Sequence, residues 1–160
     1  MNGVTLRPMT ADEFDGWARD SIVSYAQDVS VATGEPLDVT LQQANEQFPR
    51  LLPNGLETAS TWLMTIEDGE GDPVGAIWIG AHPTNQSWAY VWDIKIDEPH
   101  RGRGFGRAAM LAAEQLALDN GHSAIGLNVF GFNERARHLY ATLGYQVVST
   151  SMTKTLSTST

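Results

Sequence analysis

The first third of the chain carries hydrophobic and polar positions in a helical repeat. Thr10 and Glu13 have the spacing of a capping box, which predicts that a helix begins there. Gly34 and Pro36 indicate where this helix ends, and a second helix is expected over about residues 40–48. The apolar stripe of the first helix consists of Phe14, Trp17, Ala18, Ile22 and Tyr25.

The middle of the chain changes to the alternating pattern of β-strands. Strands are expected around residues 62–66, 74–81 and 88–96, where large apolar side chains alternate with other residues. Turn-forming residues fill the two intervals between them, at 68–73 and 82–86. Consecutive strands joined by short turns predict an antiparallel meander.

The second half alternates helix and strand signals. A helix is expected over about residues 104–119, a strand over 124–130, a short helix over 133–143 and a last strand over about 145–156. The order of the elements predicts an α+β (mixed α/β) fold, in which helices cover a mostly antiparallel sheet.

Length and composition are those of one ordinary globular domain, expected to span residues 1–160. Hydrophobic residues make up 42% and charged residues 18%, which excludes the disordered and fibrous classes. No apolar run approaches the roughly 20 residues that cross a bilayer, and the first seven residues lack the shape of a signal peptide. We therefore expect a cytoplasmic protein with no membrane partner.

Charge is distributed unevenly along the sequence. The formal net charge is −9, from 10 lysines and arginines against 19 acidic residues, yet Arg101, Arg103 and Arg107 lie within seven positions. An acidic chain lacks the basic face of a general nucleic-acid binder, so no nucleic acid partner is expected. The local cluster suits one compact anion, and the acidic remainder suits a cationic second substrate.

These arginines alternate with glycines in "RGRGFGR", at residues 101–107, between an expected strand and an expected helix. The first N–H groups of a helix have no internal partner, and the helix dipole places partial positive charge there. Glycines let the backbone curl so that several N–H groups converge on one anion. Such a turn is typical of a phosphate cradle; a flexible loop with solvated arginines is the alternative.

Two nucleotide-binding motifs fail at this turn. A P-loop requires G-x-x-x-x-G-K-[ST], and neither the spacing nor the lysine is present. A dinucleotide turn requires G-x-G-x-x-G, but counted from Gly102 the last position is Arg107. Both mismatches argue against a nucleotide-binding module.

The turn instead matches [Q/R]-x-x-G-x-[G/A], beginning at Arg101. The stretch "IKIDEPHRGRGFGRAAMLAAEQLA" resembles the acyl-CoA-binding motif of the GNAT superfamily of N-acetyltransferases. The stretch "LNVFGFNERARHLYATLGYQVV" resembles the strand–helix–strand block that follows it, with Asn133, Ala136 and Tyr140 in the family spacing. The resemblance is specific over about residues 88–148, the implied cofactor-binding core. It implies a twisted sheet with a splayed strand pair and about four flanking helices.

The resemblance also implies acetyl-CoA as a cosubstrate. Backbone N–H groups of residues 102–107 are then expected to hold the pyrophosphate, with the pantetheine arm running beside the strand at 88–96. The thioester is expected where this strand separates from its neighbour. The implied cofactor-binding residues are Ile94, Lys95, Ile96, Arg101, Gly102, Arg103, Gly104, Phe105, Gly106, Arg107, Asn133 and Tyr140.

Tyr140 is the candidate general acid. It lies seven residues after Asn133, two turns along and on nearly the same face of the short helix. Its hydroxyl is expected to protonate the departing CoA thiolate. A phenol has an ordinary pKa of about 10 and a thiol one of about 8.5, so the site has to shift one of the two pKa values for this transfer to be favourable. Because Ala136 and Leu143 share its stripe, a packing role is the alternative. Asn133 is expected to cap the helix and to contact CoA as well.

Asp93 is the candidate general base or amine-binding group. It lies between Trp92 and Ile94, and simple alternation places it on the face opposite to both. A carboxylate there accepts the proton of an attacking amine, directly or through water. Capping of nearby backbone is the alternative. A backbone N–H near Ile94 is the implied donor to the oxyanion.

The absence of cysteine narrows the mechanism. It excludes disulfides, thiolate metal sites and an acyl-cysteine, so direct transfer in a ternary complex is favoured over an acyl-enzyme. A relay through a serine stays open, and no metal is expected. The acceptor is expected to be a small-molecule amine or a peptide amine. Its pocket is expected between the first two helices, the loop at about 51–56 and the turn at 82–86. The aromatic face of Trp88, Tyr90 and Trp92 is consistent with a box for a cationic amine or, more simply, with core packing.

Two further interpretations stay open. The same fold can serve as a non-catalytic acyl-CoA-binding or sensing domain, because fold alone does not decide function. Binding of CoA without thioester hydrolysis or acetyl transfer distinguishes that case. A homodimer is also compatible with the sequence, since the last expected strand can leave an open edge.

Overall fold

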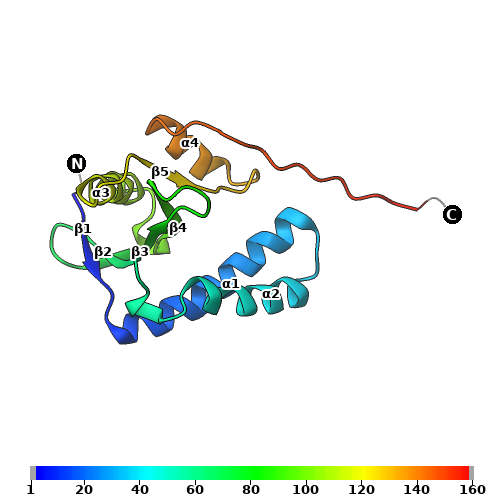
Figure 1. Cartoon of the computed structure of the whole chain (residues 1–160), viewed down its shortest axis with the longest axis horizontal. Helices are drawn as coiled ribbons and strands as arrows, with labels where there is room; N and C mark the ends of the chain where they lie inside the picture. Colours follow the sequence, from blue (N-terminus) through cyan, green and yellow to red (C-terminus); the bar gives the residue numbers. More distant parts are fainter. Residues whose placement is uncertain (1–2, 159–160) are drawn as a thin grey trace.

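The computed structural model describes residues 3–158 and places five strands in one sheet (Figure 1). The strands are β1 (Thr5–Pro8), β2 (Trp62–Glu67), β3 (Pro73–Ala81), β4 (Trp88–Ile96) and β5 (Ala124–Leu127). They lie in sequence order across the sheet, and neighbours are antiparallel except β4 and β5, which are parallel. The predicted meander and the α+β class are thus confirmed.

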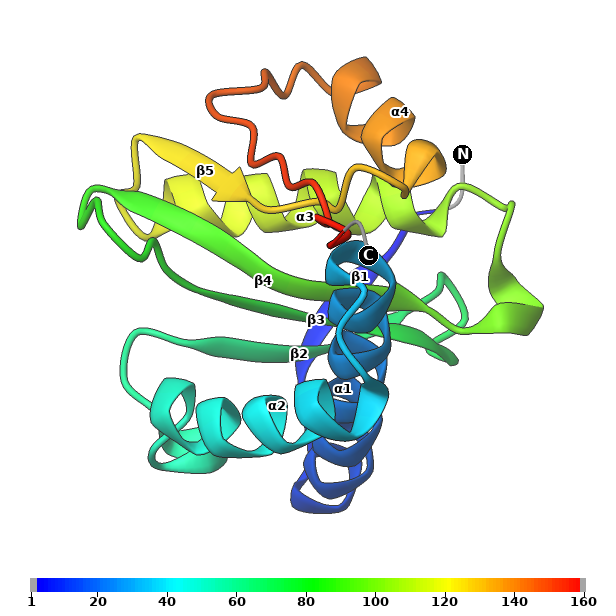
Figure 2. The ribbon, with the colours of Figure 1, turned by 90° about the vertical axis from the view of Figure 1, so that its right-hand side faces the viewer.

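Four α-helices flank this sheet within residues 3–158: α1 (Ala11–Thr33), α2 (Leu37–Leu51), α3 (Phe105–Asp119) and α4 (Glu134–Thr142). Helices α1 and α2 lie on one side of the sheet, and α3 and α4 lie on the other (Figures 1 and 2). In that part of the chain no helix is both long and apolar enough to cross a membrane.

The start of α1 confirms the predicted capping box. The N–H of Glu13 donates to Thr10 Oγ1 at 3.2 Å, and Glu13 Oε1 accepts from the Thr10 N–H at 2.8 Å. Arg7 on β1 pairs with the same carboxylate at 2.9 Å, which lowers the pKa of Glu13 to about 2. One carboxylate therefore joins the first strand to the first helix.

Helix α2 and strand β1 differ from the sequence prediction. Helix α2 extends beyond the predicted residues 40–48 at both ends and contains Pro49 in its last turn. The proline removes only one backbone N–H donor there. The next turn of the chain still closes, because the N–H of Leu52 donates to the carbonyl of Phe48. The sequence pattern misses β1, because four residues are too few to show alternation. It forms through its pairing with β2.

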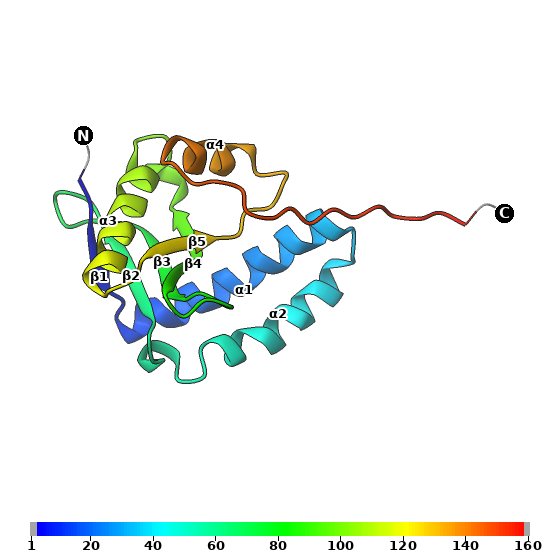
Figure 3. The same ribbon diagram turned by 45° about the horizontal axis from the view of Figure 1, so that its top comes forward.

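The predicted last strand, residues 145–156, is wrong for this structure. No strand forms there, residues 146–158 are exposed, and the segment runs away from the domain in Figures 1 and 3. Strand β5 is also shorter than predicted and ends at Leu127. A strand needs a hydrogen-bonding neighbour, and among the described residues none pairs with this segment or with the outer edge of β5.

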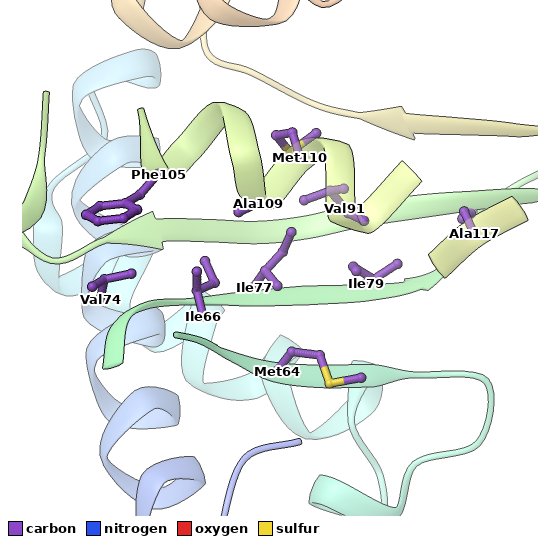
Figure 4. Packing of buried hydrophobic residues seen from close by; sticks show 12 residues of the cluster. Met64, Ile66, Val74, Ile77, Ile79, Val91, Phe105, Ala109, Met110 and Ala117 are labelled. Carbon is purple, nitrogen blue, oxygen red and sulfur yellow. The ribbon is translucent and has the colours of Figure 1, made fainter. Parts of the chain in front are cut away.

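Two apolar clusters hold the layers together. The larger lies between the sheet and α3 (Figure 4), with Ile66, Ile77 and Ile79 fully buried. The smaller lies under α1 and α2, where Trp78 meets the rings of Trp17 and Phe48 edge-on. Small side chains let α3 approach the sheet closely; its buried residues are Phe105, Ala109, Met110, Ala113 and Ala117.

Candidate functional site

Strands β4 and β5 separate halfway along β4. Their pairing runs from Trp88↔Ala124 to Val91↔Leu127 and then stops. Strand β4 continues to Ile96, paired only with β3 on its other side. The expected splayed pair is thus confirmed, and it leaves one edge of residues 92–96 with backbone groups that no neighbouring strand occupies.

The glycine–arginine turn lies beyond the end of β4 and leads into α3. Gly102 and Gly104 have φ of 75° and 85°, values that favour glycine. Gly104 is the N-cap of α3, and the first helical bond there runs from the Ala108 N–H to its carbonyl. The N–H groups of Phe105 and Gly106 precede that bond, so the geometry fits an anion cradle.

The arginines of this turn make contacts within the protein. Arg101 Nε donates to the carbonyl of Ile96 at 2.8 Å, and Arg103 lies 5.1 Å from the ring centre of Phe105. Arg107 donates to the Thr142 hydroxyl on α4. All three arginines remain exposed, so their charge borders the cradle.

A fourth arginine at this turn comes from α4. An Nη atom of Arg135 lies 3.8 Å from the point that a Cβ on Gly102 would occupy. No local pattern in the sequence predicts this approach, because it depends on how α4 packs beside α3. Arg135 thus brings a further positive charge beside the cradle, from a different element than the other three arginines.

Asp93 faces α1, and a bulge in β4 explains why. Trp78 pairs with Asp93 while Ile79 pairs with Val91, so Trp92 is an extra residue in β4. Trp92 stacks on Trp78 at 5.6 Å on the α1 side, the side on which Asp93 also bonds to α1. The expectation that Asp93 lies opposite Trp92 is therefore wrong, because the bulge interrupts the alternation.

The carboxyl of Asp93 is held by a serine that the sequence did not single out. Ser21 Oγ on α1 donates to Asp93 Oδ2 at 2.7 Å. Burial raises the pKa of Asp93, and the hydrogen bond from Ser21 opposes that rise. The sequence does contain a pattern that could have indicated this serine, because the polar Ser21 interrupts the apolar stripe of the helix midway between Trp17 and Tyr25.

Tyr140 lies on α4 and packs against the larger core cluster. Its ring centre is 5.8 Å from that of Tyr145. Burial raises the pKa of Tyr140, and the charge of Asp93 raises it further. The two candidate catalytic groups therefore come from different layers and interact electrostatically. The position of Tyr140 is compatible with a role in core packing and with a role as a general acid.

The other predicted residues lie at the start of α4 and on the second half of β4. Asn133 caps α4, accepting the N–H of Ala136 at 3.1 Å, as predicted. Ile94 and Ile96 pack against the larger cluster, which fixes the backbone at the open edge of β4, whereas Lys95 is exposed. Among residues 3–158, no three His, Cys, Asp or Glu side chains gather as a metal site.

Aromatic rings and acidic groups lie on the α1 side of β4. The rings of Tyr90 and Trp92 are 4.8 Å apart, and Tyr25 on α1 lies 6.4 Å from Phe130. Burial raises the pKa of Asp28, one further turn along α1. An open hollow of about 420 Å³ lies beyond Trp92. It is lined by Arg50, Leu51, Thr58, Ala59, Ser60, Thr61, Trp78, Ala81, His82, Pro83 and Trp92.

Comparison with known proteins agrees with this geometry. The model of the acetyltransferase (GNAT) family matches residues 26–145. The uncharacterized N-acetyltransferase YycN of Bacillus subtilis is 36% identical over 155 residues, 96% of this chain and 99% of that protein. The crystal structure of YycN superposes with a TM-score of 0.90 at 32% identity, covering 97% of this chain and 99% of that one.

A more distant structure shares the fold alone. The enzyme AAC(6')-Iy, solved with the bisubstrate analogue CoA-S-monomethyl-acetylneamine, has a TM-score of 0.61 at 13% identity, covering 97% of this chain and 99% of that one. The family model covers most of the sequence, and YycN matches it almost from end to end. This chain belongs to the GNAT family of N-acetyltransferases.

Proposed function

We propose that this protein transfers the acetyl group of acetyl-CoA directly to a primary amine of an acceptor that carries a further positive charge. The observation that carries the proposal is the open edge of β4 beyond Val91, with Asp93 on one side and Tyr140 interacting with it from α4. Family membership supports acetyl transfer. The roles of individual residues rest on the geometry of this chain.

The cradle at residues 102–107 supports binding of the CoA pyrophosphate. Its glycines have left-handed backbone, its helix N-terminus offers unpaired N–H groups, and arginines border it from two elements. The distant neighbour AAC(6')-Iy was solved with an analogue that contains CoA, so this fold accommodates the moiety. Backbone groups of Ile94 and Ile96 are then available to the pantetheine arm.

The transfer itself needs two proton movements. The neutral amine nitrogen attacks the thioester carbonyl carbon, and the carboxylate of Asp93 takes the proton that the nitrogen loses, directly or through water. A backbone N–H near Ile94 stabilises the oxyanion. The C–S bond then breaks, and the departing thiolate takes the phenolic proton of Tyr140. The products are CoA and the N-acetylated amine.

Burial shifts the pKa of both groups, which favours Asp93 as a base and sets a condition on Tyr140 as an acid. The raised pKa of Asp93 makes the carboxylate a better base near neutral pH than an exposed aspartate. The raised pKa of Tyr140 keeps the phenol protonated until the thiolate forms. Proton transfer to that thiolate is favourable only where the same dry surroundings also raise the thiol pKa.

The acceptor side favours a cation. Asp28 and Asp93 both face the region between α1 and β4, and Tyr25 and Tyr90 supply aromatic surface there. The chain as a whole carries a net charge of −9, which attracts cationic substrates. We therefore propose an acceptor with a second positive charge, such as a diamine, an aminoglycoside or a basic peptide.

An amine panel tests the proposal. The purified protein is incubated with acetyl-CoA and with diamines, amino acids, aminoglycosides or short peptides. Released CoA is measured, and acetylated products are identified by mass spectrometry. We expect transfer to cationic amines, lost in Asp93→Asn. Tight binding of acetyl-CoA with neither transfer nor thioester hydrolysis across the panel would instead support a CoA-sensing domain. A preference for neutral amines would contradict the proposed acceptor class.

A further inference from the structure

The hollow beyond Trp92 differs in charge from the rest of the acceptor side. None of the described residues that line it is acidic, and Arg50, in the last turn of α2, is the one side chain there that is always charged. Among the residues that the structure describes, no carboxylate or other group bonds to the Arg50 guanidinium. The chain as a whole has 19 acidic and 10 basic residues. An unpaired arginine beside a hollow without acidic groups therefore favours an anion.

Two further hydrogen-bond donors border the hollow. The indole N–H of Trp92 bonds to no acceptor within residues 3–158, and it lies over Gly80, where a Cβ would come within 3.1 Å of Nε1. Ser60 is the one described residue other than glycine with a positive φ, of 54°, and its hydroxyl bonds to no described group. Such backbone is uncommon outside glycine and is concentrated at binding and catalytic sites. The protein thus leaves three donors unused around one hollow.

The floor of the hollow is aromatic. Trp78 and Trp92 both line it, and their rings stack at 5.6 Å with planes 23° apart. An apolar floor with a few convergent polar groups is typical of a site for a small molecule, and a volume of about 420 Å³ lies in the range of such sites. Methylene groups that lie on the two indoles leave water, which favours binding of an aliphatic chain.

Trp92 also connects the hollow with the candidate base. Trp92 and Asp93 are consecutive residues of β4, and the bulge places both side chains on the α1 side. Trp78 pairs with Asp93, and Gly80 lies two residues further along β3, about 7 Å away at the spacing of a strand. Figure 2 shows the end of α2 and the turn between β3 and β4 at the left of the sheet, with α1 crossing its middle. One extended molecule can therefore reach from the hollow to Asp93.

We propose that this hollow is a carboxylate-binding subsite for the acceptor, and that the acceptor is a basic amino acid acetylated on its side-chain amine. The proposal rests on the proposed acetyl transfer. Arg50, Ser60 and the Trp92 N–H hold the carboxylate, and the methylenes of the acceptor lie along the indoles. The amide bond forms at the side-chain nitrogen as the C–S bond breaks, and the protons move through Asp93 and Tyr140 as described above.

The same geometry selects which amine of the acceptor reacts. The α-amine of an amino acid lies two bonds from the carboxylate carbon, so it stays near the hollow when the carboxylate is bound there. Only an amine at the end of a longer side chain spans the indole of Trp92 and meets Asp93. The α-ammonium group then supplies the further positive charge of the acceptor.

Titration calorimetry on the full-length protein saturated with CoA tests the subsite without turnover. Lysine is compared with lysinamide, which has the same two amines but no carboxylate. The acidic chain by itself favours lysinamide, the more cationic of the two, whereas we expect lysine to bind at least tenfold more tightly.

Arginine variants assign that preference to the hollow. In Arg50→Gln, lysine should bind about tenfold more weakly, as for the loss of one hydrogen bond between charged groups, and lysinamide should bind as it does to the wild type. Arg19→Gln removes an exposed arginine of α1 that does not line the hollow. This matched control should leave both affinities unchanged.

Ser60→Gly separates a contact with the ligand from a change in the fold. Glycine adopts the positive φ without strain, so the Tm should stay near that of the wild type while lysine binds severalfold more weakly. Equal affinities of the wild type for lysine and lysinamide, no binding of lysine, or a preference that survives Arg50→Gln would each overturn the proposal. Mass spectrometry that places the acetyl group on the α-amine would overturn the assignment of the reacting amine.

The amine panel separates this proposal from the proposed function. Binding of lysine that depends on Arg50, without transfer to any amine, would support the carboxylate subsite and contradict acetyl transfer. Transfer to diamines and to lysine at equal rates, both in the wild type and in Arg50→Gln, would support acetyl transfer and overturn the subsite.

Discussion

Ser21 on α1 donates a hydrogen bond of 2.7 Å to Asp93 on β4, across 72 residues of sequence. The bond exists because the bulge at Trp92 turns Asp93 toward α1. It ties the candidate base to the helix that borders the proposed acceptor site. The charge state of Asp93 should therefore respond to a change on α1.

Ser21→Ala should move the pH dependence of transfer. The hydroxyl stabilises the ionised carboxylate and so lowers the pKa of Asp93; without it, the pKa rises. Because the base acts when ionised, the acidic limb of the kcat/KM profile should shift to higher pH, by about one unit for a hydrogen bond to a charged group. Ser24→Ala, on the same helix, is the control and should leave the limb in place. An unshifted limb in Ser21→Ala would argue against Asp93 as the base.

Asp93→Asn should abolish transfer and yet stabilise the fold. Between the ordinary carboxyl pKa of 3.8 and the raised pKa in the folded state, the folded protein holds more protons than the unfolded chain. The free energy of unfolding therefore falls as pH rises through that interval. Asparagine does not titrate, so the variant keeps the free energy of unfolding that the wild type loses as pH rises. Each kcal/mol of this difference raises Tm by about 2–4 °C in a chain of this size.

Thermal unfolding of both proteins across the pH range measures this effect. The Tm difference should be near zero at pH values below 3.8, grow as pH rises and then level off. A wild type that is more stable than Asp93→Asn at neutral pH would mean that the carboxylate serves the fold rather than catalysis.

Part of the geometry of the candidate site was predictable because its signals are local in sequence. The turn at 101–107 and the pair Asn133 and Tyr140 each lie within one short stretch. The structure forms the expected cap at Asn133, and two glycines of the turn have left-handed backbone. The separation of β4 from β5 followed from the family resemblance. For the glycine–arginine turn and the Asn133 cap, local spacing sufficed because each is built within a single turn or helix.

The missed features depend on contacts between distant segments. Ser21 meets Asp93 only because α1 crosses the sheet beside a bulge, and no periodicity predicts a single extra residue in a strand. Arg135 reaches Gly102 only through the packing of α4 beside α3. The strand predicted over 145–156 has the right composition, but composition does not supply the neighbour that a strand needs.

Tyr140→Phe tests the general acid. It keeps the aromatic packing and removes the phenolic proton, so kcat should fall by about 100-fold, within the range for general acid catalysis, while the KM for acetyl-CoA changes little. Tyr145→Phe is a matched control, because its ring packs on Tyr140 but has no proposed proton to give. A wild-type kcat in Tyr140→Phe across the pH range would assign Tyr140 to packing alone.

Gly104→Ala tests the cradle. Its φ of 85° is costly for alanine, by roughly 1–2 kcal/mol, and relaxation of the turn should misalign the N–H groups that follow. Gly121, after α3, has a φ of 83°, and a Cβ at either glycine would meet no atom within 4 Å. Gly121→Ala should therefore lower stability to a similar extent. Calorimetric titration with CoA should show at least tenfold weaker binding in Gly104→Ala only; equal affinities in the two variants would rule out the cradle.

Arg135→Gln tests whether the guanidinium of Arg135 binds a phosphate of CoA at the cradle. Its guanidinium lies beside Gly102, so it should contribute a charge-assisted hydrogen bond to a phosphate of about 1.5 kcal/mol, roughly a tenfold change in Kd. Arg137 lies on the same helix but donates to the carbonyl of Gly131, and Arg137→Gln should bind CoA nearly as the wild type does. Because the lost interaction is electrostatic, the gap between wild type and Arg135→Gln should narrow as salt is added. A difference in Kd that stays constant as salt is added would indicate a change in α4 packing. Equal affinities of the two proteins at low salt would show that Arg135 does not bind CoA.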